Sequence, residues 1–399
     1  MAASEKKYAY TTLITRVSYL AGVIILAHTL KKQGSKYPLL VFYTPSLQDA
    51  GVKALELEAR KLNLILKPCE MLEPRPDIKI TLIAERFTDT WTKLRVFSVF
   101  DYDAVCYLDA DMAIFKNMDS VFSRAADLPS DWIAANHACV CNTDKDDWAP
   151  SEWNIDNCAY TPLSHPDALS HPTQVNPDSR PTYHLLNSGM FLYHPSKQLW
   201  DAMLHFFDTT DKLSTYNFPD QDFLADFFRH RWVSLGWQYN ALKTMRYIHP
   251  KMWRDDEVVC LHYIVDKPWV ARVSADGIAG FKGKDGVTHG WWWNNYADWV
   301  AQRESEGAVE ILKLMEQHSA KVDGSEEDDA DMRAIGSRVQ AFPSNKAGKE
   351  NAAPAAANAE EAKDGGDEEE ASSPFRKKVL GERGHGPVVH SQRGGETPP

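Results

Sequence analysis

The chain has 399 residues, of which 43% are hydrophobic and 11% aromatic, so it can build a large core and one to three domains. Its formal net charge of −12 argues against a general nucleic-acid-binding protein, which would carry a basic face. The apolar stretch from Val17 to Leu30 is too short to cross a bilayer, so we expect no membrane span and no secretory signal. Six cysteines over this length do not suggest a disulfide framework, and we expect a cytoplasmic location.

The composition changes at about Gly324, after which Trp and Tyr vanish and Ala, Glu, Asp, Gly and Pro dominate. Such a segment cannot bury enough apolar surface to offset its chain entropy. We therefore predict one folded domain over residues 1–320 and a disordered, acidic, low-complexity tail over residues 321–399.

Strand-like and helix-like segments alternate along the first third of the chain. The predicted strands are Tyr8–Ile14, Leu39–Tyr43, Leu64–Leu66 and Val105–Leu108. The predicted helices between them cover residues 19–32, 45–62 and 88–100. This alternation indicates βαβ units and a mostly parallel sheet, which is an α/β fold. The first turn has no G-x-G-x-x-G pattern, so a dinucleotide site is not expected.

A long insertion separates the later elements from this first part. It runs from Asn136 to Arg180, is rich in Trp, Cys, Asn and Pro, and is interpreted as a lid on the acceptor side, because so long a loop is usually functional. The predicted strands around and beyond it are Asp131–Ala135, His184–Tyr193 and Val258–Ile264. The predicted helices are Lys197–Phe207, Asp220–Arg229 and Trp299–His318.

Two carboxylates follow the fourth predicted strand. Asp109 and Asp111 stand on either side of the small residue Ala110, where the chain leaves the carboxyl edge of the sheet. Both side chains could therefore face one hard cation, and Mn²⁺ and Mg²⁺ accept carboxylate oxygens in this way. The alternative is a solvated acidic turn, because so short a motif occurs often by chance.

A second group of possible metal ligands lies in the insertion: His137, Cys139, Cys141 and Cys158. A zinc site needs about four such ligands, but the Cys-x-Cys spacing fits the usual zinc patterns poorly. Buried free thiols are ordinary core residues, and that interpretation is favoured here. A metal site at this group stays open.

Several segments, in this order and spacing, resemble glycosyltransferase family 8, the retaining enzymes that include glycogenin and plant galactinol synthase. They are Thr92-Lys-Leu-Arg95, Tyr107-Leu-Asp-Ala-Asp111, Leu186-Asn-Ser-Gly-Met190, Asp220-Gln-Asp-Phe-Leu224, Tyr239-Asn240 and His262 with Lys267-Pro-Trp269. The resemblance implies a single GT-A domain, the Rossmann-like nucleotide-diphospho-sugar transferase fold. It also implies a UDP-sugar donor and Mn²⁺, with Mg²⁺ as an alternative.

The resemblance also implies roles for individual residues. Asp109, Asp111 and His262 would hold the metal. The donor would be bound by Leu13, Thr15, Tyr19, Lys93, Asp109, Ala110, Asp111, Asn187, Ser188, Asp220, Gln221, His262 and Lys267. Asp220 and Gln221 would stand beside the anomeric carbon as the catalytic pair, and Asp220 could also cap its helix. Tyr19 has an equally weighted alternative, packing on the core.

The reaction implied is hexose transfer from UDP-glucose or UDP-galactose to a polyol such as myo-inositol or to a saccharide. Retention could use a covalent intermediate or front-face attack. Two alternatives stay open: a self-glucosylating primer protein that uses Tyr247, and a non-catalytic UDP-sugar-binding scaffold. The spacing from His262 to Lys267 is shorter than in the relatives, so the diphosphate must be held differently. A homodimer is one oligomeric state open to the chain.

Overall fold

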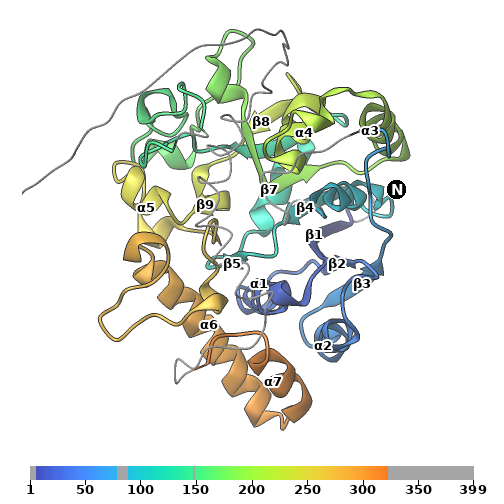
Figure 1. Cartoon of the computed structure of the whole chain (residues 1–399), viewed down its shortest axis with the longest axis vertical. Helices are drawn as coiled ribbons and strands as arrows, with labels where there is room; N and C mark the ends of the chain where they lie inside the picture. The colour runs from blue at the N-terminus through green and yellow to red at the C-terminus, as the bar shows by residue number, and fades with distance from the viewer. Residues whose placement is uncertain (1–5, 79–88, 147–148, 322–399) are drawn as a thin grey trace, which may run out of the picture. The chain divides into compact units, whose positions relative to one another are not determined.

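A seven-stranded sheet forms the centre of the chain, which this computed structural model describes over residues 6–78, 89–146 and 149–321. The strand order is β3-β2-β1-β4-β7-β6-β8, and only the pairs that include β7 are antiparallel (Figure 1). The strands are β1 (Tyr8–Ile14), β2 (Leu39–Tyr43), β3 (Leu64–Pro68), β4 (Ala104–Leu108), β6 (Ile133–His137), β7 (Leu186–Tyr193) and β8 (Trp232–Ser234). The predicted α/β class and mostly parallel sheet are confirmed.

Two separate apolar layers cover the two faces of this sheet. Within β2, Leu39 and Val41 face one layer, and Leu40 and Phe42 face the other, as the two-residue period of a strand requires. The first layer includes residues from α1 (Leu20–Lys32), α2 (Asp49–Ala59), α6 (Gly286–Ser305) and α7 (Val309–Glu316). The second includes residues from the 3₁₀ helix η3 (Thr90–Ser98), α3 (Lys197–Thr209) and α4 (Pro219–Phe227).

A second, three-stranded sheet joins distant parts of the chain. Its order is β5-β10-β9, from β5 (Met112–Ile114), β10 (Cys260–His262) and β9 (Ala241–Leu242). These strands are so short that sequence periodicity does not reveal β5 or β9, and β10 is shorter than the predicted strand over residues 258–264. In this sheet His262 lies opposite Met112, directly beyond the two carboxylates.

Three predicted helices differ from those observed. The helix predicted over residues 88–100 is a 3₁₀ helix over the described part, and α2 begins at Asp49 instead of residue 45. The helix predicted from Trp299 to His318 is two helices, because the chain turns at Gly307, whose φ of +66° suits glycine. The first of these, α6, begins much earlier than predicted.

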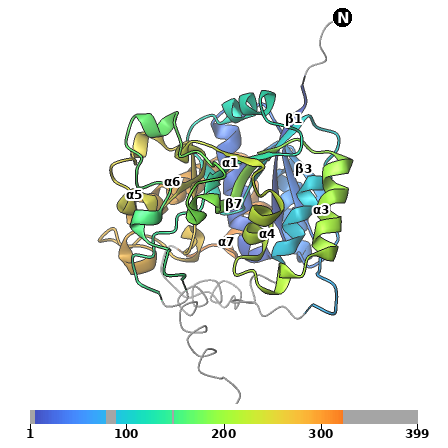
Figure 2. The ribbon, with the colours of Figure 1, turned by 90° about the horizontal axis from the view of Figure 1, so that it is seen from above.

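The insertion between β6 and β7 forms irregular chain with short 3₁₀ turns in the residues described. Its backbone contacts the segment that follows α5 (Met245–Ile248), where His165 N–H donates to the carbonyl of Lys251 at 3.1 Å. Helices α5 and α3 lie at opposite sides of the molecule (Figure 2). The insertion thus belongs to the side of the molecule that carries α5, and its role as a lid stays a prediction.

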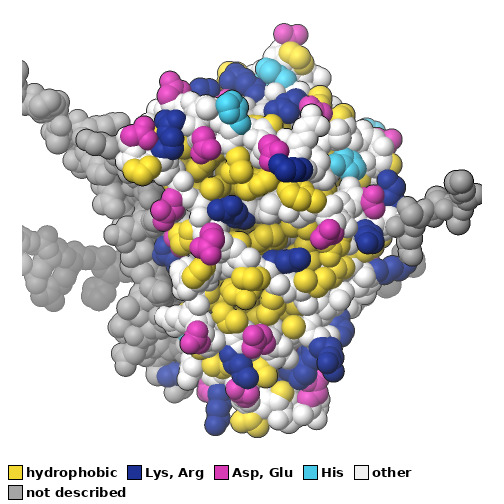
Figure 3. Space-filling model, turned by 90° about the vertical axis from the view of Figure 1, so that its right-hand side faces the viewer, with side chains coloured by type: hydrophobic (Ala, Val, Ile, Leu, Met, Phe, Trp, Pro, Cys, Tyr) yellow, Lys and Arg dark blue, Asp and Glu magenta, His cyan; other side chains and the backbone are white. Residues whose placement is uncertain are grey.

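One face of the molecule gathers apolar side chains across its middle, between scattered charged groups (Figure 3). It is the face that carries α2, β3 and α3 in Figure 1. β3 is an edge strand of the seven-stranded sheet, and Ile65 on it is 38% exposed. The predicted homodimer is not tested by these observations. The predicted disordered tail lies, from residue 322 onward, outside the described residues.

Candidate functional site

The two carboxylates lie where β4 leaves the sheet and continues into β5. All five residues of β4 are buried, and Asp109 N–H donates to the carbonyl of Gly189 on β7 at 2.8 Å. The side chain of Asp109 is 24% exposed, whereas that of Asp111 is only 8% exposed. The turn therefore presents one half-open and one buried acid, instead of two solvated ones.

His262 reaches the same place through the small sheet. Its Nε2 lies 3.2 Å from Asp111 Oδ1 and 3.8 Å from Asp109 Oδ2. One ligand atom from each of the three side chains lies within 4.8 Å of the others. The backbone N–H of Tyr263 also donates to the carbonyl of Asp111 at 2.9 Å, which holds this strand against the acidic turn. The three predicted metal ligands thus converge.

Asn240 fixes the orientation of the histidine ring. Its Oδ1 lies 2.9 Å from His262 Nδ1, and its Nδ2 donates to Asn187 Oδ1 at 2.8 Å. With the amide held in this direction, His262 donates from Nδ1, so that Nε2 faces the two aspartates. The ring is thus oriented so that Nε2 can bind a metal ion in exchange for its proton. Asn240 is part of the Tyr239-Asn240 segment that resembles the family, but the sequence alone indicates no role for it.

Lys93 forms ion pairs with two acids of the site. Its Nζ lies 3.0 Å from Asp109 Oδ1 and 2.5 Å from Asp220 Oδ2. Burial alone would lower the pKa of Lys93, but the two carboxylates outweigh burial and raise its pKa above the ordinary value. Tyr107 Oη also donates to Asp109 Oδ1 at 2.6 Å. The lysine is therefore a fixed cation between the acidic turn and α4.

Lys267 neutralises the other side of the site. Its Nζ donates to Asp111 Oδ2 and, at 3.0 Å, to the carbonyl of Tyr263. Burial raises the pKa of Asp111, but Lys267 and His262 more than offset this effect and hold the pKa below its usual range. Asp111 is thus a carboxylate at neutral pH, as a metal ligand must be.

Four polar residues from β7 and α4 meet beside Lys93. Ser188 Oγ donates to Asp220 Oδ2 at 2.8 Å, and Asn187 Nδ2 donates to Gln221 Oε1 at 3.3 Å. Gly189 lets the ring of His262 lie directly against β7, because a Cβ there would lie only 2.3 Å from His262 Cε1. The structure thus gathers the residues predicted to contact the sugar.

The prediction that Asp220 caps helix α4 is wrong. Helix α4 starts at Pro219, so Asp220 lies inside its first turn and bonds Ser188 and Lys93 instead of capping the helix. Asp222 reaches back and accepts from the backbone N–H groups of Asn217 at 2.8 Å and Phe218 at 2.9 Å. Because Asp222 satisfies the helix start, Asp220 is available to the site.

The remaining predicted donor residues lie around the end of β1, next to β4. Leu13 and Thr15 are half-buried there, and the Thr15 carbonyl accepts from Ser46 Oγ at 3.0 Å. Tyr19 is also half-buried, and its ring meets the edge of the Trp269 indole at a centroid distance of 5.7 Å. Tyr19 therefore packs on the core through Trp269, as its alternative role predicted. Its role at the uracil stays a prediction.

Ala110 is held close to helix α1. A Cβ on Gly22 would lie 2.4 Å from the Ala110 carbonyl oxygen and 2.7 Å from the Trp269 ring. Only a glycine allows the helix to approach the acidic turn this closely. The turn is therefore fixed by backbone packing as well as by hydrogen bonds, and the role of Ala110 at the ribose stays a prediction.

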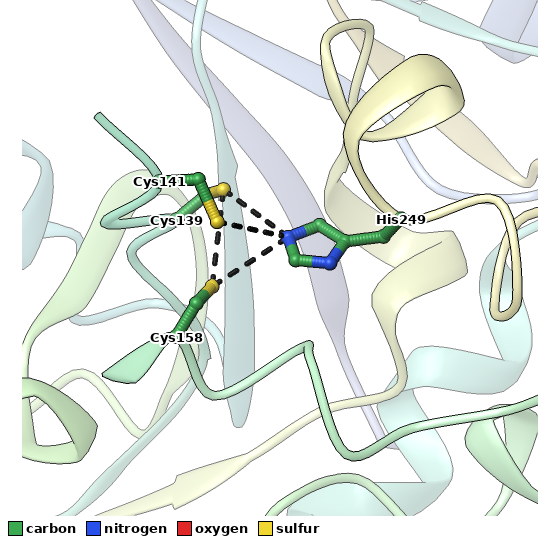
Figure 4. A group of neighbouring side chains, drawn as sticks. All are labelled: Cys139, Cys141, Cys158 and His249. Atoms are coloured by element: carbon green, nitrogen blue, oxygen red, sulfur yellow. Dashed lines mark hydrogen bonds between the residues drawn. The ribbon is translucent and has the colours of Figure 1, made fainter. Parts of the chain in front are cut away.

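The group of thiols in the insertion has a different fourth member from the one suggested by the sequence. Cys139, Cys141 and Cys158 surround His249, which follows α5 (Figure 4). His137 does not belong to this group, because its Nε2 lies 2.7 Å from the carbonyl of Thr173. The sequence suggested His137 only because it stands next to the cysteines in the chain.

None of the helices among the described residues is long and apolar enough to cross a membrane.

Comparison with known proteins gives a family and several relatives. Residues 11–272 match the family described as glycosyl transferase family 8. Galactinol synthase 1 of Ajuga reptans is 28% identical over 316 residues, which cover 77% of this chain and 86% of the relative. Galactinol synthase 2 of Arabidopsis thaliana is 29% identical over 272 residues, which cover 67% of this chain and 75% of the relative.

Solved glycosyltransferase structures are more distant. The galactosyltransferase LgtC, solved with donor and acceptor sugar analogs, is 14% identical, covers 71% of this chain and 94% of its own, and has a TM-score of 0.45. The glycosyltransferase GlyE of Streptococcus pneumoniae TIGR4 is 16% identical, covers 74% of this chain and 64% of its own, and has a TM-score of 0.46. At such scores these two structures carry no argument about the site.

Proposed function

We propose that this chain, which belongs to glycosyl transferase family 8, transfers a hexose from UDP-galactose or UDP-glucose to a polyol hydroxyl, as galactinol synthases do. The family match and the galactinol synthase relatives support a GT-A glycosyltransferase that uses a UDP-sugar. The observation that carries the proposal is the convergence of Asp109, Asp111 and His262 at the carboxyl end of β4. The acceptor proposed is myo-inositol or a related polyol, with a saccharide as the alternative.

The three converging side chains fit Mn²⁺. They offer two carboxylates and one imidazole whose Nε2 is not used by the bond that Nδ1 makes to Asn240. Carboxylate ligands suit Mn²⁺ and Mg²⁺ alike, but the imidazole favours Mn²⁺ over Mg²⁺, which prefers oxygen ligands. When bound, the ion would neutralise charge on the diphosphate leaving group.

The chain's own residues would do the rest of the work. Lys267 lies beside Asp111 and would offer its ammonium group to the diphosphate once the metal takes over that carboxylate. Asn187 and Ser188 would hydrogen-bond the sugar hydroxyls. Asp220, held by Lys93 and Ser188, would face the anomeric carbon with Gln221 and stabilise the oxocarbenium-like transition state.

The decisive experiment measures UDP release from UDP-galactose and UDP-glucose, with and without Mn²⁺ and myo-inositol. We expect turnover that requires both the metal and the polyol, with galactinol or its glucose analogue as product by mass spectrometry. Turnover with saccharides but not with myo-inositol would show that the acceptor is a saccharide and not a polyol. Inertness with both donors would contradict the proposal and favour the scaffold alternative.

Self-glycosylation is a second candidate because Tyr247 on α5 is accessible. The residue is 37% exposed, with Lys284 Nζ 4.9 Å from the ring centroid. However, burial and nearby acids raise the pKa of Tyr247 above the usual value, so its hydroxyl would need a base to react. Intact-protein mass spectrometry after incubation with donor would show a hexose ladder, absent in Tyr247→Phe, if this route operates.

The cytoplasm is the location proposed, since all six cysteines are free thiols. Fractionation of cells that express the chain would test this.

A further inference from the structure

Three thiols and one imidazole form a second group of possible metal ligands, separate from the donor residues discussed above. His249 Nε2 lies 3.5 Å from Cys139 Sγ, 3.4 Å from Cys141 Sγ and 3.6 Å from Cys158 Sγ. The sulfurs of Cys139 and Cys158 are 3.9 Å apart. Figure 4 shows the three sulfurs pointing at the same ring nitrogen.

These separations match the edges of a tetrahedron around a zinc ion. With Zn–S near 2.3 Å and Zn–N near 2.0–2.1 Å, tetrahedral geometry places two sulfurs about 3.8 Å apart and a sulfur and a nitrogen about 3.5 Å apart. A disulfide would need an S–S distance of about 2.05 Å, and all these cysteines are free. The distances therefore fit a shared metal better than an oxidised pair.

We propose that Cys139, Cys141, Cys158 and His249 bind a structural Zn²⁺ ion. Three thiolates and one imidazole are a closed, four-coordinate set that leaves no open position for a substrate. Such soft ligands favour zinc over Mn²⁺, whereas the carboxylates at Asp109 and Asp111 are ligands that suit Mn²⁺. The chain thus carries two metal sites of different chemistry.

The ion would tie the insertion to the part of the chain that carries the donor site. Cys139, Cys141 and Cys158 belong to the insertion, whereas His249 directly follows α5. Helix α5 follows β9, and β9 pairs with β10 so that Leu242 lies beside His262. The zinc would therefore anchor the proposed acceptor-side segment to the strand pair that presents His262.

The buried environment supports a structural role. Cys158 is 0% exposed and His249 is 5% exposed, and the Tyr160 ring lies 5.8 Å from the His249 ring. A buried metal with a full ligand set exchanges slowly and contributes directly to folding. On binding, each thiol would release its proton to solvent, so that affinity falls at low pH.

The first test measures metal in the full-length protein purified without added chelator. Elemental analysis should find about one zinc per chain, and replacement by Co²⁺ should give the intense thiolate-to-cobalt absorption of a tetrahedral site. Absence of zinc and of the cobalt spectrum would overturn the proposal. A disulfide between Cys139 and Cys158 in the same protein would also overturn it.

Matched variants separate this site from the donor site. His249→Ala and Cys158→Ser should lose the zinc, whereas Cys69→Ser, a half-buried cysteine outside the group, should keep it. Asp109→Asn should also keep the zinc, even if it abolishes turnover. Full zinc content in His249→Ala and in Cys158→Ser would contradict the assignment of these ligands, and the metal analysis of the unaltered protein decides the proposal if a variant does not fold.

Discussion

The two groups of potential metal ligands differ in how the chain assembles them. Asp109, Asp111 and His262 come from strand ends of two sheets and carry lysines beside the acids. The thiol group comes from an irregular insertion and one residue after a short helix. The first set has three ligands, fewer than Mn²⁺ or Mg²⁺ takes, so a bound ion would keep positions for a substrate phosphate. The second set has four ligands, which is a full set for zinc.

The number and type of ligands, more than their position in the fold, therefore distinguish a reactive metal site from a structural one. The donor site concentrates charge, because Lys93 pairs with Asp109 and Asp220, and Lys267 pairs with Asp111. The thiol group has soft ligands and would use its metal to hold two segments together. Substitutions at four residues in and beside the donor site test how that site works.

The largest effect is expected from Asp111→Asn. The amide keeps the shape but removes a metal ligand and the partner of Lys267, and loss of several kcal/mol of transition-state stabilisation corresponds to about 10³-fold in turnover. Initial rates of UDP release at saturating Mn²⁺ measure this loss. Zinc content should not change. Near-normal turnover of this variant would show that Asp111 is not a metal ligand.

Lys93→Met should reduce both stability and turnover. The lysine is the cation between Asp109 and Asp220, and removing one partner of a buried ion pair costs about 3–5 kcal/mol. Thermal unfolding with and without Mn²⁺ measures this loss, and added Mn²⁺ should recover part of it by neutralising Asp109. Equal stability of the variant and the unaltered chain would mean that the acids do not depend on this cation.

Asn240→Ala should weaken the donor site without removing a ligand. His262 would lose the bond at Nδ1 that orients its ring, and loss of such a partner typically costs 10–100-fold in metal affinity or activity. The Mn²⁺ concentration that gives half-maximal turnover measures this effect. Asn240→Asp should restore part of the affinity, because a carboxylate can accept the same proton. No rise in the Mn²⁺ requirement would contradict the orienting role.

The smallest effect concerns Asp222, which neighbours the site but is held by backbone amides. Burial raises the pKa of Asp222 to about 6, the amides of Phe218 and Asn217 oppose this, and Asp220 adds to it. Because the folded-state pKa lies above the unfolded value, the contribution to stability is present at low pH and is lost as pH rises from about 4 to about 6.

We therefore expect the free energy of unfolding of the unaltered chain to fall, relative to Asp222→Asn, over that rise in pH. Denaturant unfolding of both proteins across the range measures the difference, and groups common to both cancel. Parallel stability curves would show that Asp222 titrates normally, and the opposite slope would show that its carboxylate is stabilised in the fold.

The sequence predicted the sheet and the acidic turn because both have local signals. An apolar strand followed by Asp-Ala-Asp is visible in nine residues, and the strands around it alternate with amphipathic segments. His262 was found only through resemblance to a family. Its orienting partner Asn240 has no local signal, because the bond depends on how two short strands pair.

The thiol group shows the same limit more strongly. The sequence offered three cysteines and an adjacent histidine, but the fold points His137 at a carbonyl and brings His249 from beyond α5. No spacing rule covers ligands so far apart. The break in the helix predicted from Trp299 to His318 was also missed, because it depends on the positive φ of Gly307.

The pairing of β5 with β10 has a consequence for how tightly the donor site can hold its ion. Backbone hydrogen bonds already fix His262 opposite Met112, with Tyr263 bonded to Asp111. The entropy cost of closing the long loop between these ligands is therefore met during folding. Binding of the ion does not add this cost a second time. The ligands are arranged beforehand, so affinity for the cation would depend on desolvation and charge instead of chain ordering.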